Sequence, residues 1–236
     1  MSINKYWETV YRITDSSKWL EQTTIKFQLF EKLFDSLNID PVLVIFAGFN
    51  PLVLEMEKHY RCIVVADVTL KAQWQSSSEF VTSFDQISEP VSCVFALDEY
   101  FTYAANEQDQ RNLLQAINDN CRRAVLITTL QDYKNTAPHK RSNIESITNT
   151  NSDIVMLDQN IQNKDLKQNW QNYIYFIENH VTLKTIGPIE RRTMYFKQLA
   201  KYISDIAANE YTVHKNLLYR GYFKRYYEHI ITVRIA

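Results

Sequence analysis

Residues 42–72 read VLVIFAGFNPLVLEMEKHYRCIVVADVTLKA, and this stretch decides the fold class. Two short apolar runs, 42–47 and 62–66, are rich in β-branched residues and have the length of strands that are covered on both faces. Between them, Pro51 stands where the first turn of a helix tolerates proline, so 52–60 is predicted to be helical. Strand, helix and strand in this order are typical of a parallel βαβ unit.

The same alternation extends on both sides of this stretch. Further strands are predicted at 80–84, 91–97, 124–129, 211–219 and 226–235, the last two antiparallel to each other. Further helices are predicted at 1–20, at 22–37 with Thr23 or Thr24 as its cap, at 70–78, at 107–120 with Leu113, Leu114 and Ile117 inward, and at 190–207. We therefore predict a single α/β domain over 1–236, with N-terminal helices in 1–40. Its sheet is expected to be Rossmann-like, doubly wound, mostly parallel and seven-stranded, with an antiparallel C-terminal strand.

Residues 134–190 interrupt this alternation. The polar, Asn-rich segment 134–170 has little periodicity, so we expect a loop excursion with one short helix. Residues 172–186 alternate between apolar and polar positions and are predicted to form a strand, as half of a hairpin. The insertion is expected to act as a lid or an interface, such as that of a homodimer. The alternative is a variable surface insertion without a function.

Composition excludes several classes of site. The 236 residues include 3 glycines, where average usage would give roughly 16, and their spacing rules out both the dinucleotide-binding and the P-loop signatures. The five histidines lack metal-binding spacing, so no metal is expected. No Ser-His-Asp set is evident. The three cysteines, Cys62, Cys93 and Cys121, lie in or beside apolar runs and are predicted to be buried, reduced thiols.

Apolar runs and charge give expectations about location and partners. No run approaches the roughly 20 apolar residues of a membrane span, and the first residues lack the apolar core of a signal peptide, so a cytoplasmic location without membrane contact is expected. Abundant Asn, Ile, Lys and Tyr suit an AT-rich genome, such as that of a phage or a low-GC bacterium. Residues 1–180 carry a formal charge of −7 and residues 181–236 carry +6. This basic region could contact nucleic acid, although strands with a solvated face have the same composition.

In an open parallel sheet, ligands bind beyond the carboxyl ends of the strands. Three of the first four predicted strands end at an acid, and Gly48 follows the remaining one. The order of strands, turns and acids in residues 42–72, 91–130 and 191–236 resembles that of the class I S-adenosylmethionine-dependent methyltransferases. The resemblance implies S-adenosylmethionine as the cofactor and an unidentified methyl acceptor. The cofactor-binding residues that it implies are Ala47, Gly48, Phe49, Asp67, Val68, Phe84, Asp85, Leu97 and Asp98.

Each implied role has a physical reason. Gly48 would let the backbone approach the amino-acid part of the cofactor. Asp67 would accept hydrogen bonds from the two ribose hydroxyls. Phe84 or Asp85 would contact adenine, and Leu97 and Asp98 would line the mouth where the methyl group is transferred. No catalytic residue is assigned, because transfer requires mainly positioning.

Three alternatives stay open. The first motif has one glycine, with Phe49 and Pro51 where small residues are common, which favours an inactive methyltransferase-like fold that serves as a binding or assembly subunit. Asp67 would then only form a turn after its strand. Tyr100, Phe101 and Tyr103 either shape the acceptor site or simply pack beneath a loop. A variant of the family deprotonates an RNA ribose with a Lys-Asp-Lys-Glu set, for which the candidates are Lys26, Asp98, Lys134 and Glu190.

Overall fold

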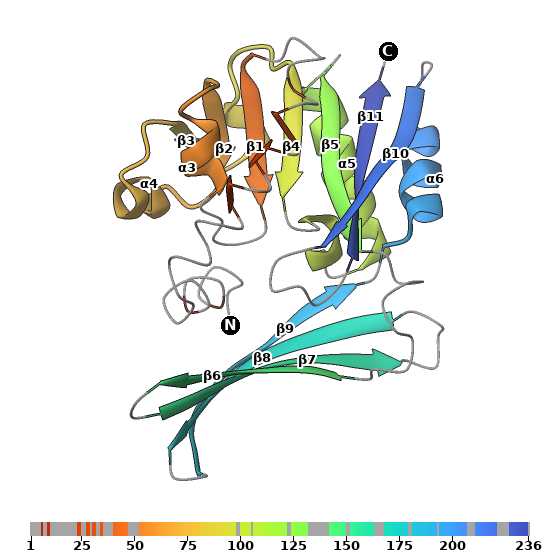
Figure 1. Cartoon of the computed structure of the whole chain (residues 1–236). Helices are drawn as coiled ribbons and strands as arrows, with labels where there is room; N and C mark the ends of the chain where they lie inside the picture. The colour runs from red at the N-terminus through yellow and green to blue at the C-terminus, as the bar shows by residue number, and fades with distance from the viewer. Residues whose placement is uncertain are drawn as a thin grey trace.

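A computed structural model of the chain gives the fold (Figure 1). The structure describes residues 6, 9, 23–24, 27–28, 30–31, 34, 40–46, 52–97, 100–104, 106–121, 124–131, 142–149, 152–162, 168–178, 181–192, 194–206, 211–220 and 227–235.

Within the described residues, seven strands form the main sheet, in the order β10-β11-β5-β4-β1-β2-β3. All its pairings are parallel except those of the last strand, which is antiparallel to both of its neighbours. The strands are β1 (Val42–Phe46), β2 (Cys62–Val65), β3 (Glu79–Val81), β4 (Cys93–Leu97), β5 (Val125–Gln131), β10 (Tyr211–Arg220) and β11 (Tyr227–Ile235). The predicted fold class, strand count and antiparallel C-terminal strand are confirmed.

The central strands are buried on both faces, as their unbroken apolar sequences predict. In β1, Val42 and Val44 enter one apolar cluster while Leu43 and Ile45 enter the other, and all four side chains are 0% exposed. A strand whose two faces are both covered cannot alternate with polar residues, which explains the apolar run.

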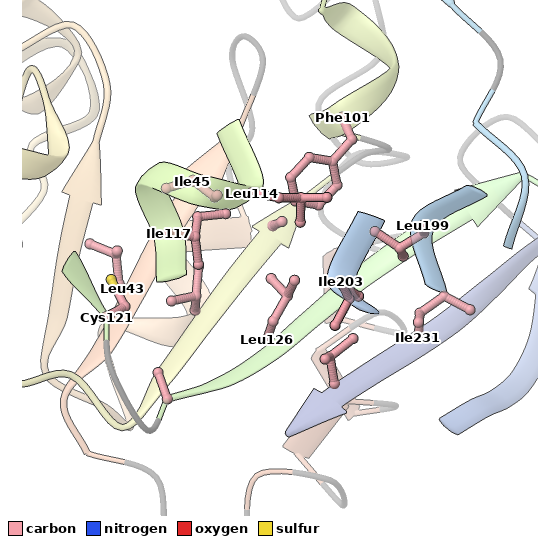
Figure 2. Close-up of a cluster of buried hydrophobic side chains, with 14 of the residues drawn as sticks. Leu43, Ile45, Phe101, Leu114, Ile117, Cys121, Leu126, Leu199, Ile203 and Ile231 are labelled. Carbon is pink, nitrogen blue, oxygen red and sulfur yellow. The ribbon is translucent and has the colours of Figure 1, made fainter. Parts of the chain in front are cut away.

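Helices cover the two faces. The helices between the strands are α3 (Leu52–Met56), α4 (Thr69–Trp74) and α5 (Glu107–Asn120), and α6 (Phe196–Ile206) precedes β10. Leu52, Val53 and Met56 of α3 pack in the first cluster with Phe27, Phe30 and Phe34. The second cluster holds α5 and α6 against β1, β4, β5 and β11 (Figure 2).

The sequence predicted α5 without error, including buried Leu114 and Ile117 and partly buried Leu113. The predicted cap at Thr23 or Thr24 is wrong, because both residues lie within a helix. Of the predicted helix 1–20, Tyr6 and Thr9 are described, and both are helical.

Residues 142–149, 152–162, 168–178 and 181–192 form a second sheet, which we call the insertion sheet. Its strands are β6 (Ser142–Asn149), β7 (Ser152–Gln162), β8 (Gln168–Glu178) and β9 (Val181–Arg192), in the antiparallel order β6-β7-β8-β9. The expected loop excursion with a short helix is therefore wrong for 142–149, 152–162 and 168–170. The predicted strand 172–186 is in fact two strands of a hairpin. Strand β6 has no apolar run and that of β7 is confined to 154–157, so the sequence carried little signal.

The helix predicted at 190–207 begins later, at Phe196. Residues 190–192 complete β9, where Glu190 pairs with Gln171 and Arg192 with Asn169 of β8. Pairing with a neighbouring strand thus overrides the helical pattern at this point.

Cys62, Cys93 and Cys121 are buried and free, as predicted. Burial raises the pKa of the Cys121 thiol to about 11. In the described part of the chain, no helix is long and apolar enough to cross a membrane. Among the same residues, no group of His, Cys, Asp and Glu could hold a metal ion.

Candidate functional site

The carboxyl ends of β1, β2 and β4 lie level with one another. Ile45 pairs with Val65 of β2 on one side and with Ala96 of β4 on the other. The chain winds from β1 outward through β2 to β3, and then returns to β4 on the opposite side of β1. The point between β1 and β4 is therefore a topological switch, where open α/β sheets bind their ligands.

Asp67 lies at this edge, directly after β2. The last hydrogen bond between β2 and β3 runs from the Ala66 N–H to the Val81 carbonyl (3.0 Å), and Asp67 follows it. Asp67 Oδ1 accepts the backbone N–H of Thr69 (2.9 Å) and the Thr69 hydroxyl (2.8 Å). These bonds, the backbone one first, lower the pKa of Asp67, so the side chain is a carboxylate at neutral pH. The predicted turn-forming role is therefore present at Oδ1.

The second carboxylate oxygen of Asp67, Oδ2, does not take part in this turn. Among the described residues, Oδ2 has no hydrogen-bond partner, and the side chain is exposed. Val68, the next residue, is 50% exposed. The turn thus presents one carboxylate oxygen and one apolar side chain outward from the edge of the sheet.

The loop after β3 stands next to this turn. Gln86 Oε1 accepts the backbone N–H of Thr82 (2.7 Å) and its hydroxyl (3.1 Å), which closes the loop. Asp85 is exposed and its Oδ1 accepts the Ser83 hydroxyl. Phe84 is half-buried and packs against the second apolar cluster. The structure therefore brings Asp67, Val68, Phe84 and Asp85 to one edge, over two adjacent strands.

The segment after β4 completes the edge. Leu97 is the last residue of β4 and pairs with Phe46 of β1. The 3₁₀ helix η2 (Tyr100–Tyr103) follows. Phe101 is 0% exposed, which confirms packing for this residue, and its ring is 5.6 Å from that of Tyr100 in an edge-on arrangement. Burial raises the pKa of Tyr100 to about 12, so its hydroxyl keeps its proton at neutral pH.

Several predicted residues lie outside the described part of the chain. They are Ala47, Gly48, Phe49 and Asp98, and also Lys26 and Lys134 of the alternative Lys-Asp-Lys-Glu set. The fourth member of that set, Glu190, lies on β9 of the insertion sheet.

The sequence reasoning missed the polar residues that hold these turns. Thr69 and Ser83 bond the two acids, and Gln86 closes the loop between them. The spacing Asp-x-Thr at 67–69 is a signal that could have identified the first turn, because an Asp side chain bonds its own backbone two residues on.

The insertion sheet lies on the same side of the molecule as this edge. Figure 1 shows β6–β9 below the main sheet, where the arrowheads of β1 and β4 point. Strand β9 packs against η2, and Ile174, Ile186 and Ile189 of β8 and β9 are buried. The sheet is therefore attached beside the segment that follows β4.

Comparison with known proteins bears on the fold. No protein-family model matches the sequence, and no curated protein is significantly similar to it. Solved structures do match over nearly the whole chain. An S-adenosylmethionine-dependent methyltransferase from Clostridium acetobutylicum is 12% identical, with a TM-score of 0.64 and 98% of each chain covered.

Two further structures are similar to the same extent. The sugar N-methyltransferase KedS8 from Streptoalloteichus is 10% identical, with a TM-score of 0.64, covering 98% of this chain and 93% of its own. CalS10, an amino pentose methyltransferase from Micromonospora echinaspora, is 7% identical, with a TM-score of 0.64 and 96% of each chain covered. At these identities the similarity concerns the fold. Together with the strand order, it shows that this chain has the class I S-adenosylmethionine-dependent methyltransferase fold.

Proposed function

We propose that this chain is a methyltransferase that uses S-adenosylmethionine. The observation that carries the proposal is the exposed turn at 67–68, beside the switch point of the main sheet. Asp67 uses one oxygen to hold its own turn and presents the other outward. A carboxylate oxygen in this position can accept hydrogen bonds from ribose hydroxyls. The similar structure of CalS10 contains bound S-adenosylmethionine, which supports this choice of nucleoside.

The other residues at the edge suit the remaining parts of such a ligand. The exposed apolar surface of Val68 would be covered by the adenine ring, with Phe84 and Asp85 on the neighbouring loop. The residues after β1 (47–49), with Leu97 and Asp98, would face the methionine part. When bound, the cofactor supplies a methyl group activated by a sulfonium centre.

This chain's own contribution would be positioning and exclusion of water. An acceptor held in line with the methyl group gains from proximity alone, and needs a base only if it must lose a proton. Tyr100 keeps its proton, so it can donate a hydrogen bond to an acceptor but cannot serve as a base at neutral pH. The insertion sheet, on this side of the main sheet, would serve as a lid over the acceptor.

Amine acceptors are the first class to test. Two of the similar structures are described as a sugar N-methyltransferase and an amino pentose methyltransferase, and a third as a glycopeptide N-methyltransferase. An amine with a neutral nitrogen can attack the methyl group without a protein base, which agrees with the protonated Tyr100.

The second candidate is an inactive methyltransferase-like subunit that binds or assembles. A specific observation favours it: Asp67 and Asp85 each bond a residue of their own turn, so both acids have a structural role without any ligand. Such a subunit could use the insertion sheet for a second copy, or the basic region 181–236 for nucleic acid.

Replacement of Asp67 by Asn separates the two candidates. The Asn carbonyl still accepts from Thr69, but its amide nitrogen replaces the outward oxygen with a donor. We expect Asp67→Asn to weaken binding of S-adenosylmethionine and its demethylated product by about tenfold or more, measured by calorimetry. The matched control is Thr69→Ala, which removes a bond of the turn but keeps the carboxylate.

Each outcome selects one candidate. A Thr69→Ala affinity within about threefold of the native value, beside a large loss for Asp67→Asn, supports the proposed site. Equal affinity for Asp67→Asn and native protein contradicts it. If native protein shows neither heat nor a thermal shift at millimolar cofactor, the enzyme proposal is wrong and the inactive subunit remains.

A further inference from the structure

The start of α5 holds the segment that follows β4. Asn106 caps the helix, its Oδ1 accepting the backbone N–H of Asp109 at 2.9 Å. One turn along, Gln110 is 0% exposed and donates from Nε2 to the carbonyl of Phe101 in η2, at 3.1 Å. Since the amide of Gln110 is fully buried, this bond has no water to replace it. This hydrogen bond therefore holds η2 against the first turn of α5.

The same turn also holds the insertion sheet. Arg192 ends β9, and its side chain is 11% exposed. Its Nη2 lies 3.5 Å from Oε2 of Glu107, the first residue of α5. Two residues that lie 85 positions apart in the sequence thus form an ion pair between the end of β9 and the first residue of α5. A guanidinium buried to this degree is costly when its acid is removed.

Further contacts fix Glu107 from the other side. Arg111, one turn along α5, lies 3.8 Å from Glu107 Oε1 and donates to Asp205 of α6 at 2.8 Å. Its guanidinium also stacks over the Tyr202 ring, 4.3 Å from the centroid. The acid that pairs with Arg192 therefore also contacts Arg111, which joins α5 to α6.

The first turn of α5 thus contacts two other segments. Through Gln110 it holds η2, and through Glu107 it holds the last residue of β9. Strand β9 itself packs against η2, with Ile186 and Ile189 buried. The insertion sheet is therefore joined to η2 along β9 and to α5 at the end of β9.

We propose that Glu107 and Arg192 are a positioning pair, which sets the spacing between the insertion sheet and η2 and thereby the space that an acceptor can occupy. This inference rests on the proposed methyltransferase function and deepens it. Neither residue is among those proposed to bind the cofactor, so the pair should act on the acceptor and leave cofactor affinity unchanged.

The test compares Arg192→Gln, Arg192→Lys and Glu107→Gln in the full chain. The matched control is Lys184→Gln, which removes an exposed positive charge from the same strand, where Lys184 Nζ lies 5.8 Å from the Phe176 ring of β8 within the insertion sheet. Amide hydrogen exchange of β9 and η2 is measured without any ligand. The dissociation constant of the demethylated cofactor product and the KM for an amine acceptor are measured on the same preparations.

We expect Arg192→Gln and Glu107→Gln to speed exchange in both β9 and η2 by about tenfold, with Arg192→Lys close to native protein. The acceptor KM should rise by about tenfold while cofactor affinity stays within about twofold. Lys184→Gln should change none of these.

Three results would overturn the inference. They are unchanged exchange in both Gln variants, faster exchange in β9 without η2, and a cofactor affinity that falls as much as the acceptor KM rises. Because Arg192→Gln and Glu107→Gln remove the same ion pair from its two ends, the test still stands if one of the two variants misfolds. If native protein binds no cofactor, the proposed function fails, and the exchange data still decide whether the pair joins the sheet to η2.

Discussion

Phe95 offers a quantitative test of how the N-terminal region is attached to the main sheet. It lies in the middle of β4 and is 0% exposed. Its ring meets those of Phe30 and Phe34 edge-on, with centroids 4.3 Å and 5.5 Å away. Truncation of a buried Phe to Ala costs about 3–5 kcal/mol, and each aromatic pair contributes about 0.5–1.5 kcal/mol of such losses. With two pairs lost, we expect Phe95→Ala to cost about 4–5 kcal/mol.

Urea unfolding followed by circular dichroism measures this cost. Thermal unfolding gives a second measure. In a chain of this length, a loss of about 1 kcal/mol of stability lowers the melting temperature by roughly 2–4 °C, so Phe95→Ala should lower it by roughly 8–20 °C. A double-mutant cycle with Phe30→Ala should show a coupling of about 0.5–1.5 kcal/mol. Val181→Ala, at a residue that is 60% exposed, should stay within about 0.5 kcal/mol of native protein. Additive effects of the two Phe replacements, or a cost for Phe95→Ala no larger than for Val181→Ala, would refute this packing.

Two further predictions concern ionisable groups. Glu57 accepts the hydroxyls of Ser76 and Ser78, each at 2.6 Å; burial acts to raise its pKa, but these bonds and those from backbone N–H groups lower it overall from 4.5. The contribution of the Glu57 carboxylate to the stability of the folded protein is therefore complete above the pKa of Glu57 in the unfolded chain, and it is lost as the pH falls through the lower folded value. The difference in stability between native protein and Glu57→Gln should shrink in acid. Urea midpoints that keep a constant difference from neutral to acidic pH would contradict this. Burial, followed by the charges of Glu57 and Asp40, raises the pKa of Cys62 to about 12, and burial raises that of Cys93 as well. Neither thiol should react with a disulfide reagent at neutral pH until denaturant is added, and rapid labelling of the native protein would show that these strands are not buried as described.

Much of the fold was predictable because the central strands must be apolar on both faces. The runs at 42–46, 62–65 and 93–97 satisfy this condition, and it distinguishes them from half-exposed strands. The helix at 107–120 was predictable to the residue, because Asn106 caps it and the apolar positions repeat along it. These signals are local, so a single sequence contains them.

The insertion sheet gave a weaker signal. Strand β6 has no apolar run, and β7 has one of four residues at 154–157 between polar ends, while both strands pair along their length with their neighbours. Backbone hydrogen bonds between strands do not depend on residue type, so a polar segment can be a strand without an apolar run. The late start of α6 has the same cause, because residues 190–192 pair with β8.

The candidate site divides in the same way. Sequence alone determined that acids follow β2 and β3, because turns after buried strands favour short polar side chains. Only the tertiary structure decided that Asp67, Phe84 and Leu97 share one edge, that the oxygens of Asp67 differ, and that Glu107 meets Arg192. The physical reason is distance along the chain: strand ends and ion-pair partners that lie tens of residues apart come together only when the sheet order and the packing of the helices are set.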